Sequence, residues 1–130
     1  MAKVILATTL LTSIITPVSS ASKRVTCYLP TGHRTASGHA FNPNICAANM
    51  YRFGDVIELT NTGEVLVVGD RSAKSAGHRI DRAVYKYRPG KYPDRSNVRL
   101  VSRGMGRNRY DAVRRGLQIR KNYLMKKGTR

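Results

Sequence analysis

The chain is short of acidic side chains, with seven aspartates and glutamates among 130 residues against 24 lysines and arginines. The formal net charge of +17 makes an anionic partner the natural expectation, and nucleic acid, anionic lipid and the anionic bacterial envelope all qualify. A hydrophobic content of 41% excludes a disordered, purely charged chain. The length suits one domain with a modest core.

Long apolar runs are also scarce, and the only one in the sequence lies near the N-terminus. The basic start "MAK" is followed by "VILATTLLTSIITPV" (4–18) and by "SSA", which ends at Ala21. This order of segments predicts a secretory signal peptide over residues 1–21, and the run is shorter than the ~20 apolar residues of a membrane span. The alternatives are an uncleaved anchor and a buried helix. We expect a mature chain from Ser22 that is secreted, periplasmic or held at the cell envelope.

Cysteine and histidine are few, with two and three residues respectively. No CxxC or HExxH pattern occurs, so we expect neither a metal site nor any other cofactor. Cys27 and Cys46 both follow the signal peptide, and an even count in an exported chain predicts one disulfide. It would close a loop of about 20 residues and stabilise the fold by ~3 kcal/mol. The alternative is two free, buried thiols.

Charge is distributed unevenly along the chain. Residues 23–85 carry 8 basic and 5 acidic side chains, whereas residues 86–130 carry 15 basic and 2 acidic ones. The join lies in "YKYRPGKYPDRSN" (85–97), whose prolines and glycine favour turns. We therefore divide the chain into a signal peptide, a domain over 22–90 and a basic extension over 91–130.

The domain has the pattern of a β protein. Residues 55–61 alternate in polarity, "NTG" supplies a turn, and "EVLVVGD" (64–70) is an apolar strand, so we predict a hairpin over 55–69. Residues 24–29 also favour a strand, and 79–87 suit a strand or a short helix. Short strands between turns indicate a small barrel or sandwich.

The extension contains one amphipathic segment over 108–127. Tyr110, Val113, Leu117 and Leu124 recur near one helical face, with basic residues elsewhere, and Gly116 is a weak point. This predicts a basic helix. Two interpretations remain open: a solvated helix docked on the barrel, or a binder of anionic surfaces.

Four motifs in sequence resemble a known family. "RTASG" (34–38), "FGDVIELTN" (53–61), "VLVVGDR" (65–71) and "HRID" (78–81) occur in the order found in double-psi β-barrels of the RlpA-like, 3D-domain and expansin type. The resemblance covers about 60 residues. It implies a mostly β fold, a small six-stranded double-psi β-barrel, to which this chain adds a basic, partly helical C-terminal extension.

The resemblance also implies a function, because many relatives cleave peptidoglycan glycan strands as lytic transglycosylases. Asp70 occupies the position of the family's catalytic acid, and Asp81 corresponds to a second member of the same acidic cluster. Cleavage of a glycosidic bond needs a proton for the leaving oxygen, and a transglycosylase can use one carboxyl group for both proton steps. The simpler alternative for either residue, and above all for Asp81, is a structural ion pair with an arginine.

One position departs from the family pattern. Where RlpA-like enzymes have a histidine and 3D-domain proteins an aspartate, this chain has Asn49, which cannot exchange a proton at ordinary pH. Expansin-type relatives keep the barrel and groove and disrupt the polymer without hydrolysis. A non-catalytic cell-wall binding module is therefore the second hypothesis.

Five further residues are candidates for substrate binding beside Asn49. Tyr28 and Tyr51 can stack on sugar rings or be half-buried core residues. Thr35 and Ser37 can line the groove through their hydroxyls or serve a turn, and Arg71 follows Asp70 directly.

Nucleic-acid binding is the third hypothesis, suggested by the charge alone. The signal peptide favours export, and no RRM, helix-turn-helix or zinc pattern occurs. We therefore expect a monomer whose partners are peptidoglycan or a related polysaccharide and, through the basic extension, the anionic cell envelope.

Overall fold

The structure is a computed structural model that describes residues 22–128, so the predicted signal peptide lies outside the described residues. Within that range the chain forms seven strands, one short 3₁₀ helix and one α-helix. The strands are β1 (Lys23–Tyr28), β2 (Ile45–Ala48), β3 (Val56–Leu59), β4 (Glu64–Asp70), β5 (Ile80–Ala83), β6 (Arg95–Ser96) and β7 (Val98–Ser102). The helices are η1 (Lys74–Ala76) and α2 (Arg109–Gly128).

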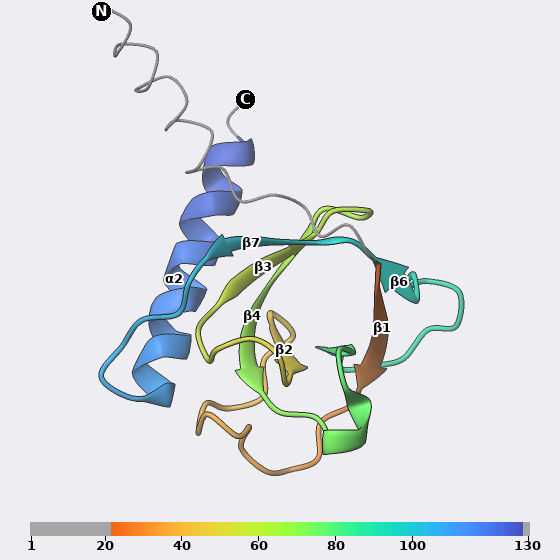
Figure 1. The fold of residues 1–130 in the computed structure, drawn as a ribbon, viewed down its shortest axis with the longest axis horizontal. Helices are drawn as coiled ribbons and strands as arrows, with labels where there is room; N and C mark the ends of the chain where they lie inside the picture. The colour runs from red at the N-terminus through yellow and green to blue at the C-terminus, as the bar shows by residue number, and fades with distance from the viewer. Residues whose placement is uncertain (1–21, 129–130) are drawn as a thin grey trace, which may run out of the picture.

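All strands belong to one curled mixed sheet with the order β6-β1-β5-β2-β4-β3-β7, and α2 lies along one side of it (Figure 1). The pairs β1–β5 and β2–β4 are parallel. The other neighbours are antiparallel. The protein is therefore mostly β with a C-terminal helix, as the sequence predicts, and the hairpin expected over 55–69 is formed by β3 and β4.

The two edges of the sheet are joined through consecutive residues. β6 pairs with β1 and β7 pairs with β3, and only Asn97 separates β6 from β7. The first part of the predicted extension over 91–130 therefore supplies two strands of the same sheet. The sequence did not predict these two strands, because residues 95–102 include basic side chains and form short strands that are held by backbone pairing.

Successive side chains of a strand point to opposite faces of the sheet, and apolar residues on both faces form two clusters. The interior cluster lies inside the curled sheet and includes Val25, Cys46, Ile57, Leu66 and Val68. The helix-facing cluster joins the opposite face of the sheet to α2. It contains Ile45, Val56, Val65, Val67 and Val113, with Leu117, Tyr123 and Leu124 packed against it.

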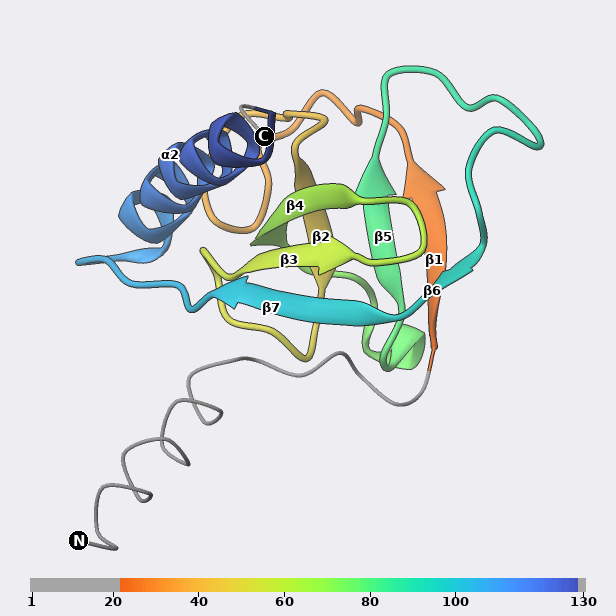
Figure 2. The ribbon, with the colours of Figure 1, turned by 90° about the horizontal axis from the view of Figure 1, so that it is seen from above.

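The helix docks closely because glycines meet where it crosses the sheet. A Cβ atom on Gly116 would lie 2.7 Å from the Gly54 carbonyl oxygen and 2.7 Å from Val67 Cγ1. Gly116 is thus a contact point, although the helical pattern alone marks it as a weak point. α2 packs on β4 and β3 (Figure 2), and no helix in the described part is long and apolar enough to cross a membrane.

The predicted disulfide is absent, because Cys27 and Cys46 are free thiols. Both residues pair with Arg82, Cys27 from β1 on one side and Cys46 from β2 on the other. β5 therefore separates them, and two inter-strand spacings place their Cα atoms roughly 9–10 Å apart. A disulfide needs Cα atoms within about 7 Å.

Candidate active site

A hollow of about 230 Å³ lies where β4 and β5 present their aspartates. We call it the Asp70 groove. Its walls include Tyr28 of β1, Phe41 of the loop before β2, and both Asp70 and Asp81. The two aspartates, which are eleven positions apart in the chain, therefore share one surface.

An irregularity between β2 and β4 aims Asp70 into this groove. Cys46 pairs with Val68, but Ala47 pairs with Asp70, so Gly69 is left without a partner. Strict alternation would turn Asp70 toward the interior like Val68. The extra residue reverses its direction, as β-bulges commonly do near sites. A Cβ at Gly69 would lie 2.9 Å from Ile45 Cγ2, so a larger residue would have to displace the buried Ile45 side chain.

Ala47 spaces the two aspartates. It pairs with Asp70 on β4 and with Asp81 on β5, so the aspartate Cα atoms are separated by two inter-strand spacings, roughly 9–10 Å. The small Ala47 side chain also lines the groove. A ligand can therefore lie between the two carboxylates.

Three donors hold the Asp70 carboxylate in place. Oδ1 accepts the backbone N–H of Ala36 at 2.8 Å and that of Arg71 at 2.9 Å. Oδ2 accepts the hydroxyl of Tyr28 at 3.2 Å. Burial, together with the charge and hydrogen bond of Asp70, raises the pKa of Tyr28 far above its ordinary value. The Tyr28 hydroxyl therefore remains a donor across the working pH range.

The partners of Asp81 are two side chains. Its Oδ1 accepts the hydroxyl of Thr26 at 2.6 Å, and Arg79 lies 3.9 Å from Oδ2. The predicted ion pair with an arginine is present, and Asp81 nevertheless lines the groove. This arrangement suits a residue that braces or orients a ligand more than one that exchanges protons.

The "TASG" loop contributes through its backbone. Ala36 donates to Asp70, and Ser37 N donates to the Gly69 carbonyl oxygen at 3.3 Å. The buried hydroxyls of Thr35 and Ser37 hydrogen-bond each other at 2.9 Å, and Thr35 also donates to the His39 carbonyl oxygen. Thr35 lines the groove, whereas Ser37 is not among its lining residues. The turn role considered for both residues is the one their contacts describe.

Asn49 lies beneath the loop that follows Asp70. Its Nδ2 donates to the Ala73 carbonyl oxygen at 2.9 Å, and its Oδ1 accepts the Ser72 N–H at 2.9 Å. These bonds fix the segment between β4 and η1. Asn49 borders a separate shallow hollow and is not among the residues that line the Asp70 groove.

The remaining candidates separate into one groove residue and one core residue. Arg71 lines the groove, donates to the Ala48 carbonyl oxygen at 2.6 Å and places its guanidinium carbon 3.9 Å from the Phe53 ring centre. Burial and the nearby Arg109 lower the pKa of Arg71. Tyr51 packs against the interior cluster, and burial raises its pKa. The half-buried core role is the one its contacts describe.

Several groove residues carried no signal in the sequence. Phe41 and His33 line the groove from an irregular loop that lacks periodicity. Ala36 acts through its backbone N–H and Ala47 through its size, and neither property is visible in a residue pattern. Among residues 22–128 no cluster of three or more His, Cys, Asp or Glu is arranged to hold a metal ion.

Comparison of the chain with protein-family models, curated proteins and solved structures finds no match. The assignment of a function therefore depends on the geometry of the groove and on the sequence motifs that form it.

Proposed function

We propose that this protein is exported and cleaves peptidoglycan glycan strands as a lytic transglycosylase, with Asp70 as general acid and base. One observation carries the proposal. The Asp70 carboxylate is turned by a bulge into an open groove, is held by three donors and faces Asp81 across Ala47. Cleavage of a glycosidic bond by an enzyme usually requires carboxyl groups beside the bond that breaks.

We also propose that the fold is the double-psi β-barrel that the four motifs imply. The two parallel pairs and the link between the sheet edges support it. β6 and β7, separated by Asn97 alone, can be counted as one bent strand, which gives the six strands of that fold.

In the proposed reaction Asp70 first gives its proton to the oxygen that leaves as the glycosidic bond breaks. The sugar's own 6-hydroxyl then bonds to the anomeric carbon, and its proton passes to Asp70. The product is a 1,6-anhydro sugar, no water is consumed, and Asp70 ends in its starting state. The three donors that face Asp70 fix the direction of its carboxyl group in the groove. Asp81, which is held by its hydrogen bond from Thr26, orients the glycan strand.

Export and charge complete the proposal. The predicted signal peptide would deliver the protein to the periplasm or the outer cell surface. The basic face of α2, which includes Arg114, Arg115 and Lys121, would hold it near the anionic envelope.

The decisive test is mass spectrometry of purified sacculi after digestion. Asp70→Asn removes the exchangeable proton with almost no change in volume, so we expect release of anhydro-sugar fragments to fall at least about 100-fold. Asp81→Asn should retain measurable release. Asp94→Asn is the matched control, because Asp94 is exposed and contributes its backbone carbonyl to β1. Undiminished release by Asp70→Asn would refute the proposal.

A non-catalytic, expansin-like binder is the second candidate, and the aromatic wall of the groove favours it. Tyr28 and Phe41 meet edge to face with ring centres 5.9 Å apart, and such rings offer faces to sugars. In addition, Asn49 replaces a titratable residue and braces a loop. This hypothesis predicts sedimentation with sacculi and no released fragment from the wild-type protein.

A further inference from the structure

The Asp70 groove is one of three hollows that are linked by shared lining residues. Phe41, His33 and Arg34 line both the groove and a neighbouring hollow, whose other walls include Tyr85. Tyr85 in turn lines a third hollow of about 310 Å³. The rings of Phe41 and Tyr85 are in contact, with centres 5.1 Å apart. A line of aromatic rings therefore leads from Tyr28, beside Asp70, to the third hollow.

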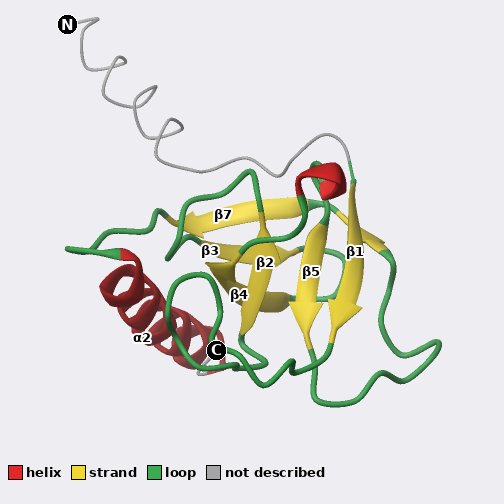
Figure 3. Cartoon of the chain, turned by 90° about the horizontal axis from the view of Figure 1, so that it is seen from below, coloured by secondary structure: helices red, strands yellow, loops and turns green. Residues whose placement is uncertain are grey.

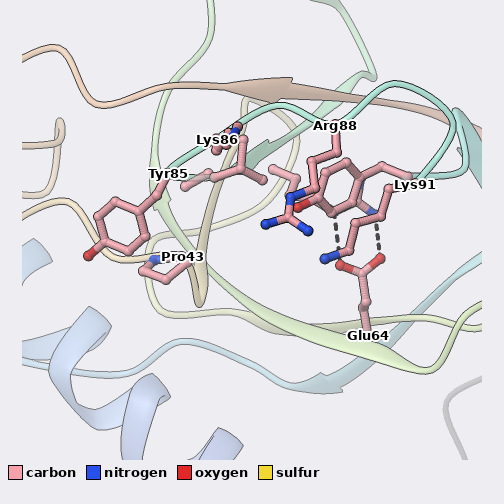
Figure 4. A pocket seen from close by; sticks show the side chains of 10 residues that line it. Pro43, Glu64, Tyr85, Lys86, Arg88 and Lys91 are labelled. Carbon is pink, nitrogen blue, oxygen red and sulfur yellow. Dashed lines mark hydrogen bonds and ion pairs between the residues drawn. The ribbon is translucent and has the colours of Figure 1, made fainter.

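The third hollow is strongly cationic, and we call it the cationic hollow. Lys86, Arg88 and Lys91 line it from the segment between β5 and β6. This segment projects from the sheet on the side away from α2 (Figure 3). Tyr85 and Pro43 lie at one end of the hollow, and Lys91 and Glu64 at the other (Figure 4).

The floor of this hollow is a fixed ion pair. Arg82 is 2% exposed and donates from Nε to Glu64 Oε2 at 2.8 Å and from Nη2 to Glu64 Oε1. Its guanidinium carbon also lies 4.8 Å from the Tyr92 ring centre. The one carboxylate of the hollow is thus already engaged by a buried arginine.

The other cations of the hollow are uncompensated. In the described part of the chain no carboxylate forms an ion pair within 4.0 Å of Lys86, Arg88 or Lys91. The Lys91 ammonium lies 5.5 Å from the centre of the Tyr92 ring. Three positive side chains around one hollow favour an anion, and lysine and arginine bind carboxylates by charge-assisted hydrogen bonds. Tyr85 and Tyr92 add ring faces that suit a sugar.

We propose that the cationic hollow is a subsite that binds a carboxylate carried by the same polysaccharide strand that occupies the Asp70 groove. The inference rests on the proposed function, since it takes the groove ligand to be a wall glycan. The carboxylate belongs either to a sugar of the strand or to a peptide attached to it. The ring contacts from Tyr28 through Phe41 to Tyr85 give one sugar chain a path between the two sites.

The test measures binding separately from cleavage. Soluble glycan fragments are titrated calorimetrically into the Asp70→Asn protein, which does not cleave them if the proposed function holds. One fragment carries free carboxylates and a second carries the same groups as neutral methylamides. The variant Lys86→Gln/Lys91→Gln removes two exposed cations. The control variant Arg24→Gln/Lys74→Gln removes the same charge at two exposed positions that line neither the Asp70 groove nor the cationic hollow.

We expect the protein with these four cations to prefer the carboxylate fragment, and Lys86→Gln/Lys91→Gln to bind it roughly 3- to 10-fold more weakly. Binding of the methylamide fragment should not change, and the control variant should retain the preference. Equal binding of the two fragments, or an equal loss in the control, would overturn the inference. Peptide-free and peptide-bearing fragments then identify which carboxylate is bound.

The two proposals fail in different ways. Absence of fragment release by the protein with Asp70 intact overturns the enzymatic function, while carboxylate-dependent binding lost in Lys86→Gln/Lys91→Gln still supports the subsite. Failure of every fragment to bind overturns the subsite, and the enzymatic function is then decided by fragment release from sacculi.

Discussion

The two aspartates of the groove take their directions from neighbouring residues. Asp70 faces the groove because Gly69 interrupts the register with β2. Asp81 has a hydroxyl and an arginine as partners, whereas the donors to Asp70 are two backbone N–H groups and Tyr28. The difference in partners makes Asp70 the better candidate for proton transfer and Asp81 the better candidate for orientation.

Replacement of Tyr28 by phenylalanine tests this arrangement. Tyr28→Phe keeps the ring that meets Phe41 but removes the hydroxyl donor to Asp70. We expect anhydro-sugar release to fall about 10-fold, with a loss of no more than about 1.5 kcal/mol in the free energy of unfolding. Fragment release and urea denaturation measure the two effects. Tyr87→Phe, at an exposed tyrosine, is the control, and unchanged release by Tyr28→Phe would show that the hydroxyl is dispensable.

The helix α2 is positioned by contacts at both of its ends and along its buried face. Asn108 Oδ1 accepts the Asp111 N–H at 2.8 Å, as helix-capping residues do. Near the other end, Lys127 and Tyr123 both donate to Glu58 of β3. Burial alone would raise the pKa of Glu58, but these hydrogen bonds outweigh it and lower the pKa. The basic helix is therefore a docked part of the domain, and its outer face remains available for an anionic surface.

For Gly116 we predict a change in the free energy of unfolding that is opposite to the one expected from helix propensity. In an isolated helix Gly→Ala stabilises by about 1 kcal/mol. Here the new Cβ would meet the Gly54 carbonyl oxygen, so we expect Gly116→Ala to destabilise the protein by about 1–3 kcal/mol through overpacking. Gly128→Ala in the same helix, where a Cβ meets nothing within 4 Å, should not destabilise. Equilibrium denaturation compares the two, and a stabilised Gly116→Ala would contradict the docked geometry.

The beginning of α2 makes the stability of the protein depend on pH. The backbone N–H of Arg107 and the guanidinium of Arg114 lower the pKa of Asp111 to about 2. A lowered folded-state pKa contributes stability above the ordinary value, near 4, that is lost as the pH falls toward about 2. We expect the melting temperature of the wild type to drop over this interval more steeply than that of Asp111→Asn. Asp94→Asn should follow the wild type. If the melting temperature of Asp111→Asn fell with pH in parallel with that of the wild type, the lowered pKa of Asp111 would be contradicted.

The whole molecule is held by a sheet whose edges are joined by the chain and by two apolar clusters on its opposite faces. Strand order decides which residues are neighbours. It separates Cys27 from Cys46 by β5, although the two lie close in the sequence. Stability therefore comes from the packing of the sheet and helix, with no contribution from a disulfide between these residues.

Thiol labelling tests this strand order. Cys46 is fully buried, and burial, followed by the nearby Asp81, raises its pKa, while Cys27 is half-buried. We expect iodoacetamide to modify Cys27 alone in the native protein and both thiols in denaturant, as shown by mass spectrometry. Reducing agent should leave the melting temperature unchanged. An intact mass lacking the two thiol hydrogens would show a disulfide and refute the strand order.

Local patterns were sufficient for the β3–β4 hairpin, for most of α2 and for the mostly β class, because alternation and helical periodicity record which faces are buried. The resemblance of four motifs to a known family marked Asp70 and Asp81 as candidates. The tertiary structure decided the remainder. Residues 95–102 joined the sheet, the cysteines were kept apart, Asn49 and Tyr51 were placed outside the groove, and Phe41 was brought into it. These outcomes depend on strand order and on one unpaired glycine, and neither leaves a periodic trace in the chain because both arise from contacts between residues distant in sequence.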